Sequence, residues 1–229
     1  MISRSLKAIY YTLSAIPLRV NGIVYKAFRS PTNGVVKVHL GPGQDHYLPG
    51  WINVDANFIS AKIDVWANLM DPLPFRDNSV DVFYSHHVIE HLPDSFLPNH
   101  CRELYRCLKP GGCIRIGGPH AESAARKFLE GDLSWFPDFP DSRKSLGGRF
   151  ANFILCRGEH LTILTYSYLH ELLTDSGFVD VKQARPVNET FHPQWIDHTV
   201  LANENEDTPE VPHTLLVEAD KPSTAKLPG

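Results

Sequence analysis

Short β-rich runs recur along this chain, and most of them stop at a glycine or at an acidic residue. Residues 35–40 (VVKVHL) run into Gly41-Pro42-Gly43, and residues 52–55 (INVD) end at Asp55. Similar runs cover residues 63–66, 80–84, 113–116, 178–182 and 214–219, while residues 96–108 and 168–175 have helical spacing. Strands that alternate with helices predict a parallel sheet with crossover connections. We therefore predict a Rossmann-like α/β domain over residues 33–220, with a seven-stranded, mostly parallel sheet.

The first 32 residues form a separate basic segment. Apolar residues follow helical spacing over residues 6–16 and again over residues 20–28, with Pro17 between the two stretches. This predicts two amphipathic helical pieces, because proline removes a backbone hydrogen bond inside a helix. Six Lys and Arg residues and no Asp or Glu precede Asp45. We expect this helical extension to pack on the domain, with weak contact to a membrane phospholipid surface as the alternative.

The four cysteines do not form a disulfide framework. Cys101, Cys107, Cys113 and Cys156 show no C-x-x-C spacing, which predicts buried free thiols in a reducing compartment. No apolar run approaches the roughly 18–20 residues of a membrane span, and no signal-peptide cleavage site follows residues 8–16. We therefore expect a cytoplasmic protein, peripheral to the membrane at most, with a disordered tail over residues 221–229.

Residues 87–91 (HVIEH) match the H-x-x-E-H signature of the inverted zinc peptidases. Such a site needs both histidines on one helix face and a third ligand from another helix. No downstream acid stands out as that ligand, and the stretch directly follows the predicted strand at residues 80–84. Because ligands of open α/β sheets bind at the carboxyl ends of strands, we predict that His87 opens a helix at a nucleotide-type site without a metal. A divalent ion at Glu90 and His91 is the alternative.

The first two predicted strands indicate which nucleotide this is. Gly41 and Gly43 allow the backbone to approach a ligand closely, and an acid at the end of the next strand can accept hydrogen bonds from ribose hydroxyls. A dinucleotide site would require a third glycine at position 46 and a helix facing the diphosphate, but His46 stands there and Pro49-Gly50 interrupts any helix. The stretch from residue 44 to residue 51 is also too short for a crossover helix. We therefore predict a nucleoside ligand without phosphates.

Several stretches, taken in their order and spacing, resemble the class I S-adenosylmethionine-dependent methyltransferases. They are HLGPG (39–43), GWINVD (50–55), residues 67–92, ELYRCLKPGGCIRIGGP (103–119), LHELLTDSGFVDV (169–181) and PHTLLVEADKP (212–222). The resemblance is in particular to a small bacterial group often found beside surface-polysaccharide genes. It implies the methyltransferase fold, S-adenosyl-L-methionine as cofactor and a role in polysaccharide biosynthesis. That group also tends to replace the helix after the first strand with a short loop.

The resemblance implies a role for each matching residue. The cofactor-binding residues would be Leu40, Gly41, Pro42, Gly43, Asp55, Asn68, Leu69, Ser85 and His86. The backbone of the glycine turn would line the methionine part, Asp55 would hold the ribose, and Asn68 would accept a hydrogen bond from the adenine amino group. Relatives commonly carry Asp where Asn68 stands, so this chain keeps the acceptor and loses a charge.

Four histidines are candidates for a catalytic base. An oxygen acceptor gives up a proton during methyl transfer, and histidine is the natural base near neutral pH. His86 and His87 are the first choices because they follow the predicted fourth strand, and His120 and His160 come next. Residues 131–160 are predicted to form a substrate lid. Its Trp135, Arg149 and Arg157 would stack on a sugar or nucleoside and hold phosphate or carboxylate, unless they only anchor the loop.

We therefore predict methyl transfer to a small-molecule or glycan acceptor, with oxygen as the acceptor atom. The principal alternative is a non-catalytic cofactor-binding or scaffold protein on the same fold, which the Asn at position 68 and the shortened loop would favour. A dehydrogenase and a zinc peptidase are further alternatives. Nucleic acid is not an expected substrate, because the chain after residue 44 is acidic and has no basic groove signature. The oligomeric state stays open.

Overall fold

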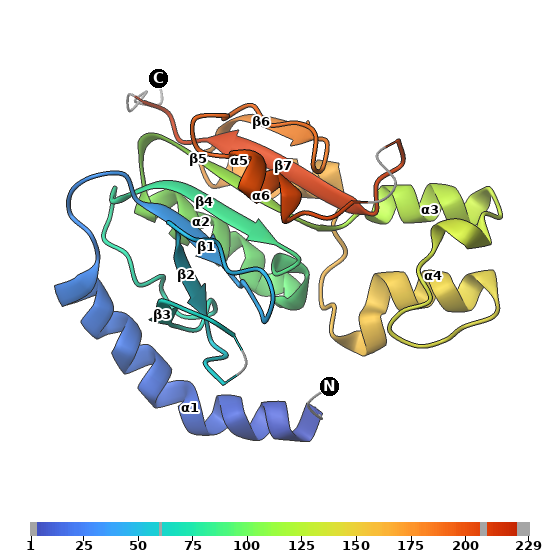
Figure 1. Ribbon diagram of the computed structural model, residues 1–229, viewed down its shortest axis with the longest axis horizontal. Coiled ribbons are helices and arrows are strands. Elements are labelled where there is room, and N and C mark those ends of the chain that lie inside the picture. The colour runs from blue at the N-terminus through green and yellow to red at the C-terminus, as the bar shows by residue number, and fades with distance from the viewer. Residues whose placement is uncertain (1–3, 60, 207–209, 224–229) are drawn as a thin grey trace.

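The computed structural model describes residues 4–59, 61–206 and 210–223, and its centre is one seven-stranded sheet. The strands are β1 (Lys37–Leu40), β2 (Ile52–Asp55), β3 (Val65–Trp66), β4 (Val80–His86), β5 (Leu108–Pro119), β6 (Val179–Ala184) and β7 (Thr214–Asp220). They are ordered β3-β2-β1-β4-β5-β7-β6, and only β7 runs antiparallel to its neighbours (Figure 1). The prediction of seven mostly parallel strands is confirmed.

One face of the sheet is covered by helices, as in a conventional crossover fold. Helices α2 (Leu97–Cys107) and α5 (Tyr166–Asp175) lie behind the sheet in Figure 1 and bury its main apolar core. Leu104 and Leu173 of these helices are fully buried there, together with Phe83 of β4. Both helices were predicted from their apolar spacing, and their ends lie within two residues of the predicted ones.

The opposite face is covered without a helix between β1 and β2, as the short spacing predicted. Leu48 and Trp51 of the β1–β2 loop pack against Val82 and Tyr84 of β4. Ile196 and Val200, from the long β6–β7 connection and its short helix α6 (His198–Ala202), complete this second cluster. A segment about 150 residues downstream therefore covers the face of the sheet that a crossover helix between β1 and β2 would otherwise cover. The sequence patterns did not reveal this contact.

A buried ion-pair network holds this downstream segment on the sheet. Arg115 of β5 is completely buried and binds Glu204 through two hydrogen bonds, Nε–Oε1 at 2.6 Å and Nη2–Oε2 at 2.9 Å. Its Nη1 donates to Oε1 of Glu218 on β7 at 2.5 Å. Because an unpaired buried charge is costly, all three residues must stay together when the segment docks.

The basic N-terminal segment forms one long helix rather than two pieces. α1 (Arg4–Val24) continues through Pro17 into a wider π-helical turn at Tyr25–Arg29. The predicted break is wrong, because the helix continues although Pro17 cannot donate a backbone hydrogen bond to the Leu13 carbonyl; the Leu13 residue is 76% exposed. α1 runs beside the β3 edge of the sheet (Figure 1), where the Asn21 amide donates to the Trp66 carbonyl at 2.6 Å.

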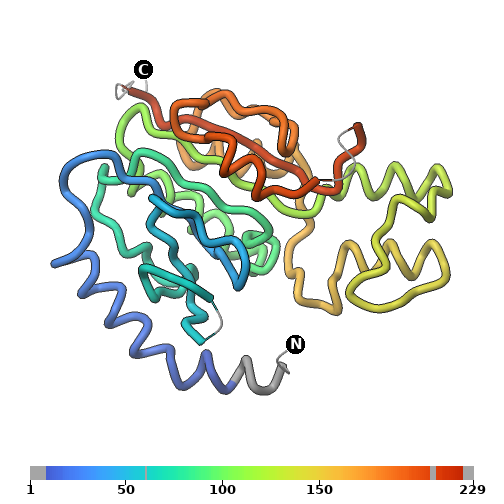
Figure 2. Tube along the Cα trace, viewed as in Figure 1, coloured from blue at the N-terminus to red at the C-terminus, as the bar shows by residue number. Residues whose placement is uncertain are grey.

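A second small helical unit projects from the carboxyl end of β5. It contains α3 (Ala121–Leu129), α4 (Leu146–Leu155) and the short turns Leu133–Trp135 and Cys156–Gly158, and it lies to one side of the sheet (Figure 2). α3 and α4 were not predicted as helices. Their own small core contains Ala124, Trp135 and Phe136. Three cysteines are buried free thiols, as predicted, whereas Cys156 is only half-buried.

The C-terminal end of the described chain is tied to the body. Lys221 Nζ donates to the carbonyl oxygens of Tyr105 and Leu108, at 2.8 and 2.9 Å. Residues 224–229, most of the predicted disordered tail, lie outside the described residues.

Candidate active site

Parallel pairing brings three strand ends to one edge of the sheet. Leu40, the last residue of β1, lies in register with Val54 on one side and with Ser85 on the other. The residues that follow these strands therefore lie along a single edge of the sheet, which is the usual ligand position in an open α/β sheet. The glycine turn, Asp55 and the His86–His87 pair all belong to this edge, as predicted from their positions after strands.

The glycine turn after β1 requires glycine at its first position. Gly41 has a φ of +69°, and a Cβ atom there would lie 2.4 Å from Cγ2 of Val88. Pro42 and Gly43, whose φ is +57°, complete the turn, and the Gly43 N–H donates to Oδ2 of Asp55 at 3.2 Å. The turn therefore packs closely against Val88 and orients the acid on the neighbouring strand.

Asp55 is held in place and keeps capacity for further hydrogen bonds. Its Oδ1 accepts from the Asn57 N–H at 2.8 Å, and its Oδ2 accepts from Gly43. A carboxylate has about four acceptor positions, so about two remain for the two hydroxyls of a ribose. Burial raises the pKa of Asp55, and the backbone hydrogen bonds act in the opposite direction.

Asn68, the predicted adenine partner, is used locally in the structure. Its Oδ1 accepts a hydrogen bond from the Met70 N–H at 3.1 Å, as in an Asx turn. One acceptor position of this oxygen remains for an amino group. Leu69 is buried beside it, with 8% of its surface exposed.

The last two residues of β4 each have a buried polar atom that finds no hydrogen-bond partner among the described residues. They are Ser85 Oγ and His86 Nε2. Such atoms are costly unless a ligand satisfies them, so they indicate where a bound molecule would make polar contacts. Burial lowers the pKa of His86 well below its ordinary value, and the neighbouring His87 lowers it further. The His86 imidazole is therefore neutral at pH 7.

His87 does not open a helix, and this prediction is wrong. It has a φ of +55°, and only a three-residue 3-10 turn, Ile89–His91, follows before the next turn at Asp94–Phe96. His87 and His91 consequently do not share a helix face, as an inverted zinc peptidase site would need. His87 Nδ1 lies 3.1 Å from Oε1 of Glu90, and its Nε2 lies 3.2 Å from the Thr214 hydroxyl.

The other two candidate bases occupy different positions. His120 caps α3 by accepting from the Ser123 N–H at 3.4 Å, and its Nε2 lies 3.2 Å from the side-chain amide of Gln183. Burial lowers the pKa of His120. His160 lies against His91, with 5.0 Å between ring centroids, and its Nδ1 lies 3.0 Å from the Ile154 carbonyl.

The predicted substrate-binding residues of the lid make internal contacts. Trp135 is 6% exposed, and its Nε1 donates to the Val211 carbonyl at 2.8 Å. Arg149 donates to the carbonyls of Phe136 and Arg143, at 3.0 and 2.9 Å. Arg157 binds the Asp141 carboxylate and the Pro140 carbonyl. These contacts match the alternative, in which the three residues anchor the loop.

One contribution to this edge of the sheet was missed from the sequence. The Tyr10 hydroxyl of α1 donates to the carbonyl of Ala56, the residue after Asp55, at 2.5 Å. Burial and the nearby Asp55 carboxylate raise the pKa of Tyr11. The N-terminal helix therefore reaches this edge beside Asp55. The adjacent tyrosines within an amphipathic stretch were the only signal of this contact.

S-Adenosylmethionine fits the residues at this edge. Asp55 has acceptor positions for ribose hydroxyls, and a Cβ atom at Gly43 of the turn after β1 would lie in open space. Among the described residues, Ser85 Oγ and His86 Nε2 have no hydrogen-bond partner, and the resemblance implies the methionine part there.

Comparison with known proteins agrees with this arrangement. A model of the methyltransferase domain family matches residues 33–116. A search of curated proteins found no match. An S-adenosylmethionine-dependent methyltransferase from Archaeoglobus fulgidus is similar in structure, with a TM-score of 0.51 and 17% identity over 96% of this chain and 95% of that one. A second one, from Thermotoga maritima, has a TM-score of 0.51 and 15% identity over 95% and 96% of the two chains.

A phosphoethanolamine N-methyltransferase from Haemonchus contortus, solved with S-adenosylhomocysteine, has a TM-score of 0.50 and 14% identity. The match covers 87% of this chain and 51% of that enzyme, so the chain corresponds to about half of its length. At these identities structural likeness establishes the fold alone, and that fold is the class I methyltransferase fold. The family match adds that residues 33–116 of this chain are similar to a methyltransferase domain.

Proposed function

We propose that this protein transfers the methyl group of S-adenosylmethionine to an oxygen atom of a small-molecule or glycan acceptor, such as a surface-polysaccharide precursor. The observation that carries the proposal is the group of polar residues at the neighbouring ends of β1, β2 and β4. There, an oriented Asp55 with free acceptor positions shares one edge with the unpartnered Ser85 Oγ and His86 Nε2.

The protein's own residues would have only a few roles in this reaction. When bound, S-adenosylmethionine supplies a methyl group already activated on a sulfonium sulfur. The protein positions the acceptor in line with it and excludes water. His86 Nε2 would take up the proton that the acceptor hydroxyl loses when it is methylated. General-base assistance of this kind contributes about 10²–10⁴-fold.

His86 suits this role better than its neighbour. Its buried Nε2 has no hydrogen-bond partner, and its lowered pKa keeps the imidazole neutral. Both ring nitrogens of His87 already lie within hydrogen-bond distance of Glu90 and Thr214. His87 is therefore the second choice for the base, and its φ of +55° turns the chain away from β4.

Calorimetry with S-adenosylhomocysteine tests the cofactor site. Asp55→Ala removes charged hydrogen bonds worth about 1.5–3 kcal/mol, which corresponds to a loss of affinity of roughly 10- to 150-fold. Asp180→Asn, which changes an exposed acid on β6, serves as the matched control and should leave affinity unchanged. Absence of binding to the unaltered protein at high micromolar ligand would refute the proposal.

Labelled cofactor incubated with cell extracts and with an acceptor panel tests the reaction. His86→Gln should lower kcat by about 10²–10⁴-fold if this residue is the base, and His87→Gln should have the smaller effect. A small amine is the rival acceptor, because the similar Haemonchus enzyme is an N-methyltransferase. Cofactor binding without turnover across the whole panel would instead favour the non-catalytic role.

The proposed location is the cytoplasm, with α1 lying on an anionic membrane surface. Several large apolar side chains of α1 are exposed at helical spacing: Ile9 (55%), Leu13 (76%), Ile16 (77%), Val20 (52%) and Ile23 (62%). No helix in the described part of the chain combines the length and hydropathy needed to span a bilayer. An apolar face flanked by basic residues suits a helix lying in the membrane interface.

Charge favours an anionic surface over a second copy of the chain as the partner. No acidic residue precedes Asp45, so two α1 helices packed face to face would bring together Arg19, Lys26 and their copies without any counter-charge. Phosphatidylserine lipids provide that negative charge.

Vesicle co-sedimentation tests this location. Ile16→Asp should reduce partition onto phosphatidylserine vesicles by about 10-fold or more, because burial of one such side chain is worth about 1.5–3 kcal/mol. Leu129→Asp is the matched control, since Leu129 is 84% exposed on α3. Equal binding of the two variants, or a dimer in solution that Ile16→Asp dissociates, contradicts membrane contact.

A further inference from the structure

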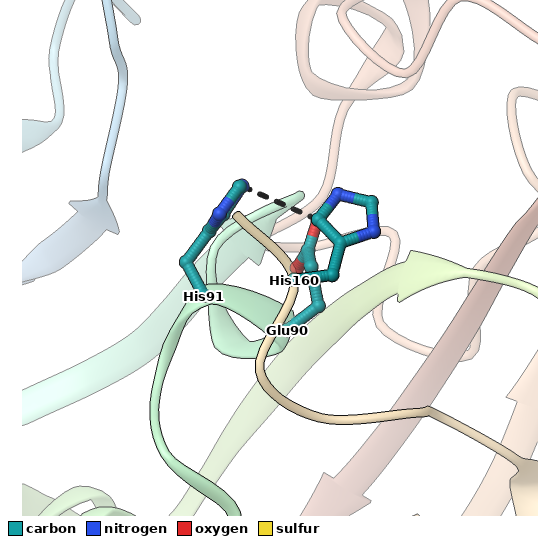
Figure 3. A group of neighbouring side chains, drawn as sticks. All are labelled: Glu90, His91 and His160. Carbon is teal, nitrogen blue, oxygen red and sulfur yellow. Dashed lines mark ion pairs between the residues drawn. The ribbon is translucent and has the colours of Figure 1, made fainter. Parts of the chain in front are cut away.

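Three side chains with metal-ligating atoms meet beside the candidate active site (Figure 3). Glu90 and His91 come from the turn after β4, and His160 comes from the segment that follows α4. One ligating atom of each lies within 4.8 Å of the others, and His91 Nε2 is 3.8 Å from Oε1 of Glu90. His91 and His160 are separated by almost 70 residues in the chain, so the fold alone brings them together.

The two histidines are held in the form that can bind a metal. Nδ1 of His91 lies 3.0 Å from the Glu159 carbonyl, and Nδ1 of His160 lies 3.0 Å from the Ile154 carbonyl. A carbonyl oxygen can only accept a hydrogen bond, so each Nδ1 carries the proton and each Nε2 keeps its lone pair. Metal-binding histidines are typically oriented by this kind of outer hydrogen bond.

Glu90 adds a buried negative charge. Its side chain is only 1% exposed, and its Oε2 has no hydrogen-bond partner in the described structure. A Cβ atom on Gly118 would lie 2.7 Å from this oxygen, so a glycine is needed there for the carboxylate to fit. His87, at 3.1 Å from Oε1, is its only close side-chain hydrogen-bond partner among those described. A buried carboxylate with one such partner is a strong acceptor for a cation.

The backbone around the cluster is fixed. The N–H groups of Leu161 and Thr162 both donate to the Glu90 carbonyl, at 2.7 and 3.1 Å. The Thr162 hydroxyl also donates to the Leu92 carbonyl at 2.9 Å. These bonds tie the segment that carries His160 to the turn that carries His91, so the three side chains are positioned before any ion binds.

We propose that Glu90, His91 and His160 bind one divalent transition-metal ion, with water completing its coordination. Two imidazoles and a carboxylate suit Zn²⁺, Co²⁺ or Mn²⁺ better than Mg²⁺ or Ca²⁺, which prefer oxygen ligands. In a tetrahedral zinc site with bonds of about 2.1 Å, ligating atoms lie about 3.4 Å apart. Small side-chain adjustments from the observed 3.8 Å reach this geometry.

This site differs from the peptidase site that H-x-x-E-H suggests. His160, far away in sequence, takes the place of His87, which remains hydrogen-bonded to Glu90 and Thr214. The inference does not depend on methyl transfer, because metal binding is measured without cofactor or acceptor.

The test is a titration of the chelator-treated full-length protein with Co²⁺ and with Zn²⁺, followed by calorimetry and by the visible absorption of bound Co²⁺. We expect one equivalent of bound metal. His91→Ala and His160→Ala should each weaken binding by more than the 10- to 100-fold that loss of an outer hydrogen-bond partner typically costs. No binding to the unaltered protein at high micromolar metal overturns the proposal.

His192→Ala is the matched control, because Cys113, His192 and Asp220 form a second close group of ligating side chains. Binding that is lost in His192→Ala and kept in His160→Ala also overturns the proposal. X-ray absorption of the Zn²⁺-loaded unaltered protein tests the same assignment even where a variant fails to fold. Nitrogen and oxygen neighbours without sulfur support the site, and a sulfur neighbour contradicts it.

Discussion

Replacement of Arg115 by methionine tests how the β6–β7 connection is held on the sheet. The substitution preserves much of the side-chain volume and removes the charge that pairs with Glu204 and Glu218. All three side chains are at most 1% exposed, so the two carboxylates stay buried without a counter-charge. Removing one partner of a buried ion pair costs about 3–5 kcal/mol. This is a large part of the roughly 5–15 kcal/mol that stabilises a typical domain.

We expect the loss of stability in Arg115→Met to lie near the lower end of the range of about 3–5 kcal/mol, because backbone N–H groups still donate to both carboxylates. The Val187 N–H donates to Glu204 at 2.7 Å, and the Phe191 N–H donates to Glu218 at 2.7 Å. In the folded variant the pKa of the Glu204 carboxyl should rise further, because burial already raises it and Arg115, which acts in the opposite direction, is gone. A group whose folded pKa is raised binds more protons when folded, so stability rises as pH falls. The deficit of Arg115→Met should therefore shrink between pH 7 and about pH 5.

Urea unfolding followed by circular dichroism at pH 7 and pH 5 measures both effects. Arg126→Met is the matched control, because Arg126 is 66% exposed and pairs with Glu130 on the surface. Such surface pairs contribute about 0–1 kcal/mol. A loss below about 1 kcal/mol for Arg115→Met at pH 7 would show that the ion-pair network does not anchor the segment. A deficit that is the same at both pH values would refute the reasoning about buried carboxylates.

Three further changes probe other parts of the structure. Gly41→Ala should destabilise the fold by about 1–3 kcal/mol and weaken S-adenosylhomocysteine binding, because the new Cβ would meet Val88 at 2.4 Å. Gly34→Ala is the control: Gly34 has a φ of +80° and no atom within 4 Å of a Cβ there, so this change should add only backbone strain. Burial lowers the pKa of the His39 imidazole from 6.5 to about 4. Between these two pH values the unfolded chain therefore binds a proton on His39 that the folded protein does not bind. Stability should therefore fall with decreasing pH by up to about 1.4 kcal/mol per pH unit from this residue, and His39→Gln should show a shallower fall in urea titrations. Arg157→Ala should change the KM for the acceptor little in the labelled-cofactor assay, since the Arg157 guanidinium binds Asp141. A KM raised tenfold or more would show that Arg157 binds the substrate.

Local patterns were sufficient to predict the sheet and the position of the candidate site. A strand needs only a few residues of suitable type, and its end is marked by glycine or an acid, as at Gly41 and Asp55. Parallel pairing then places the ends of the parallel strands on one edge, so Gly41, Asp55 and the His86–His87 pair could be expected to lie together there. Their roles toward a cofactor came from the family resemblance. Helix α1 was predicted less well. Propensity rules end a helix at proline, whereas α1 continues through Pro17.

The sequence by itself determined which segments become strands and which residues stand at their ends. Only the tertiary structure decided which distant side chains meet there. Arg115 and Glu218 are 103 residues apart in the chain, and the His91 ring lies against the ring of His160, which belongs to the segment after α4. Periodicity within one segment carries no information about such pairs, because they arise from the order in which strands and connections pack. The buried charges and the proposed metal site are consequences of that packing.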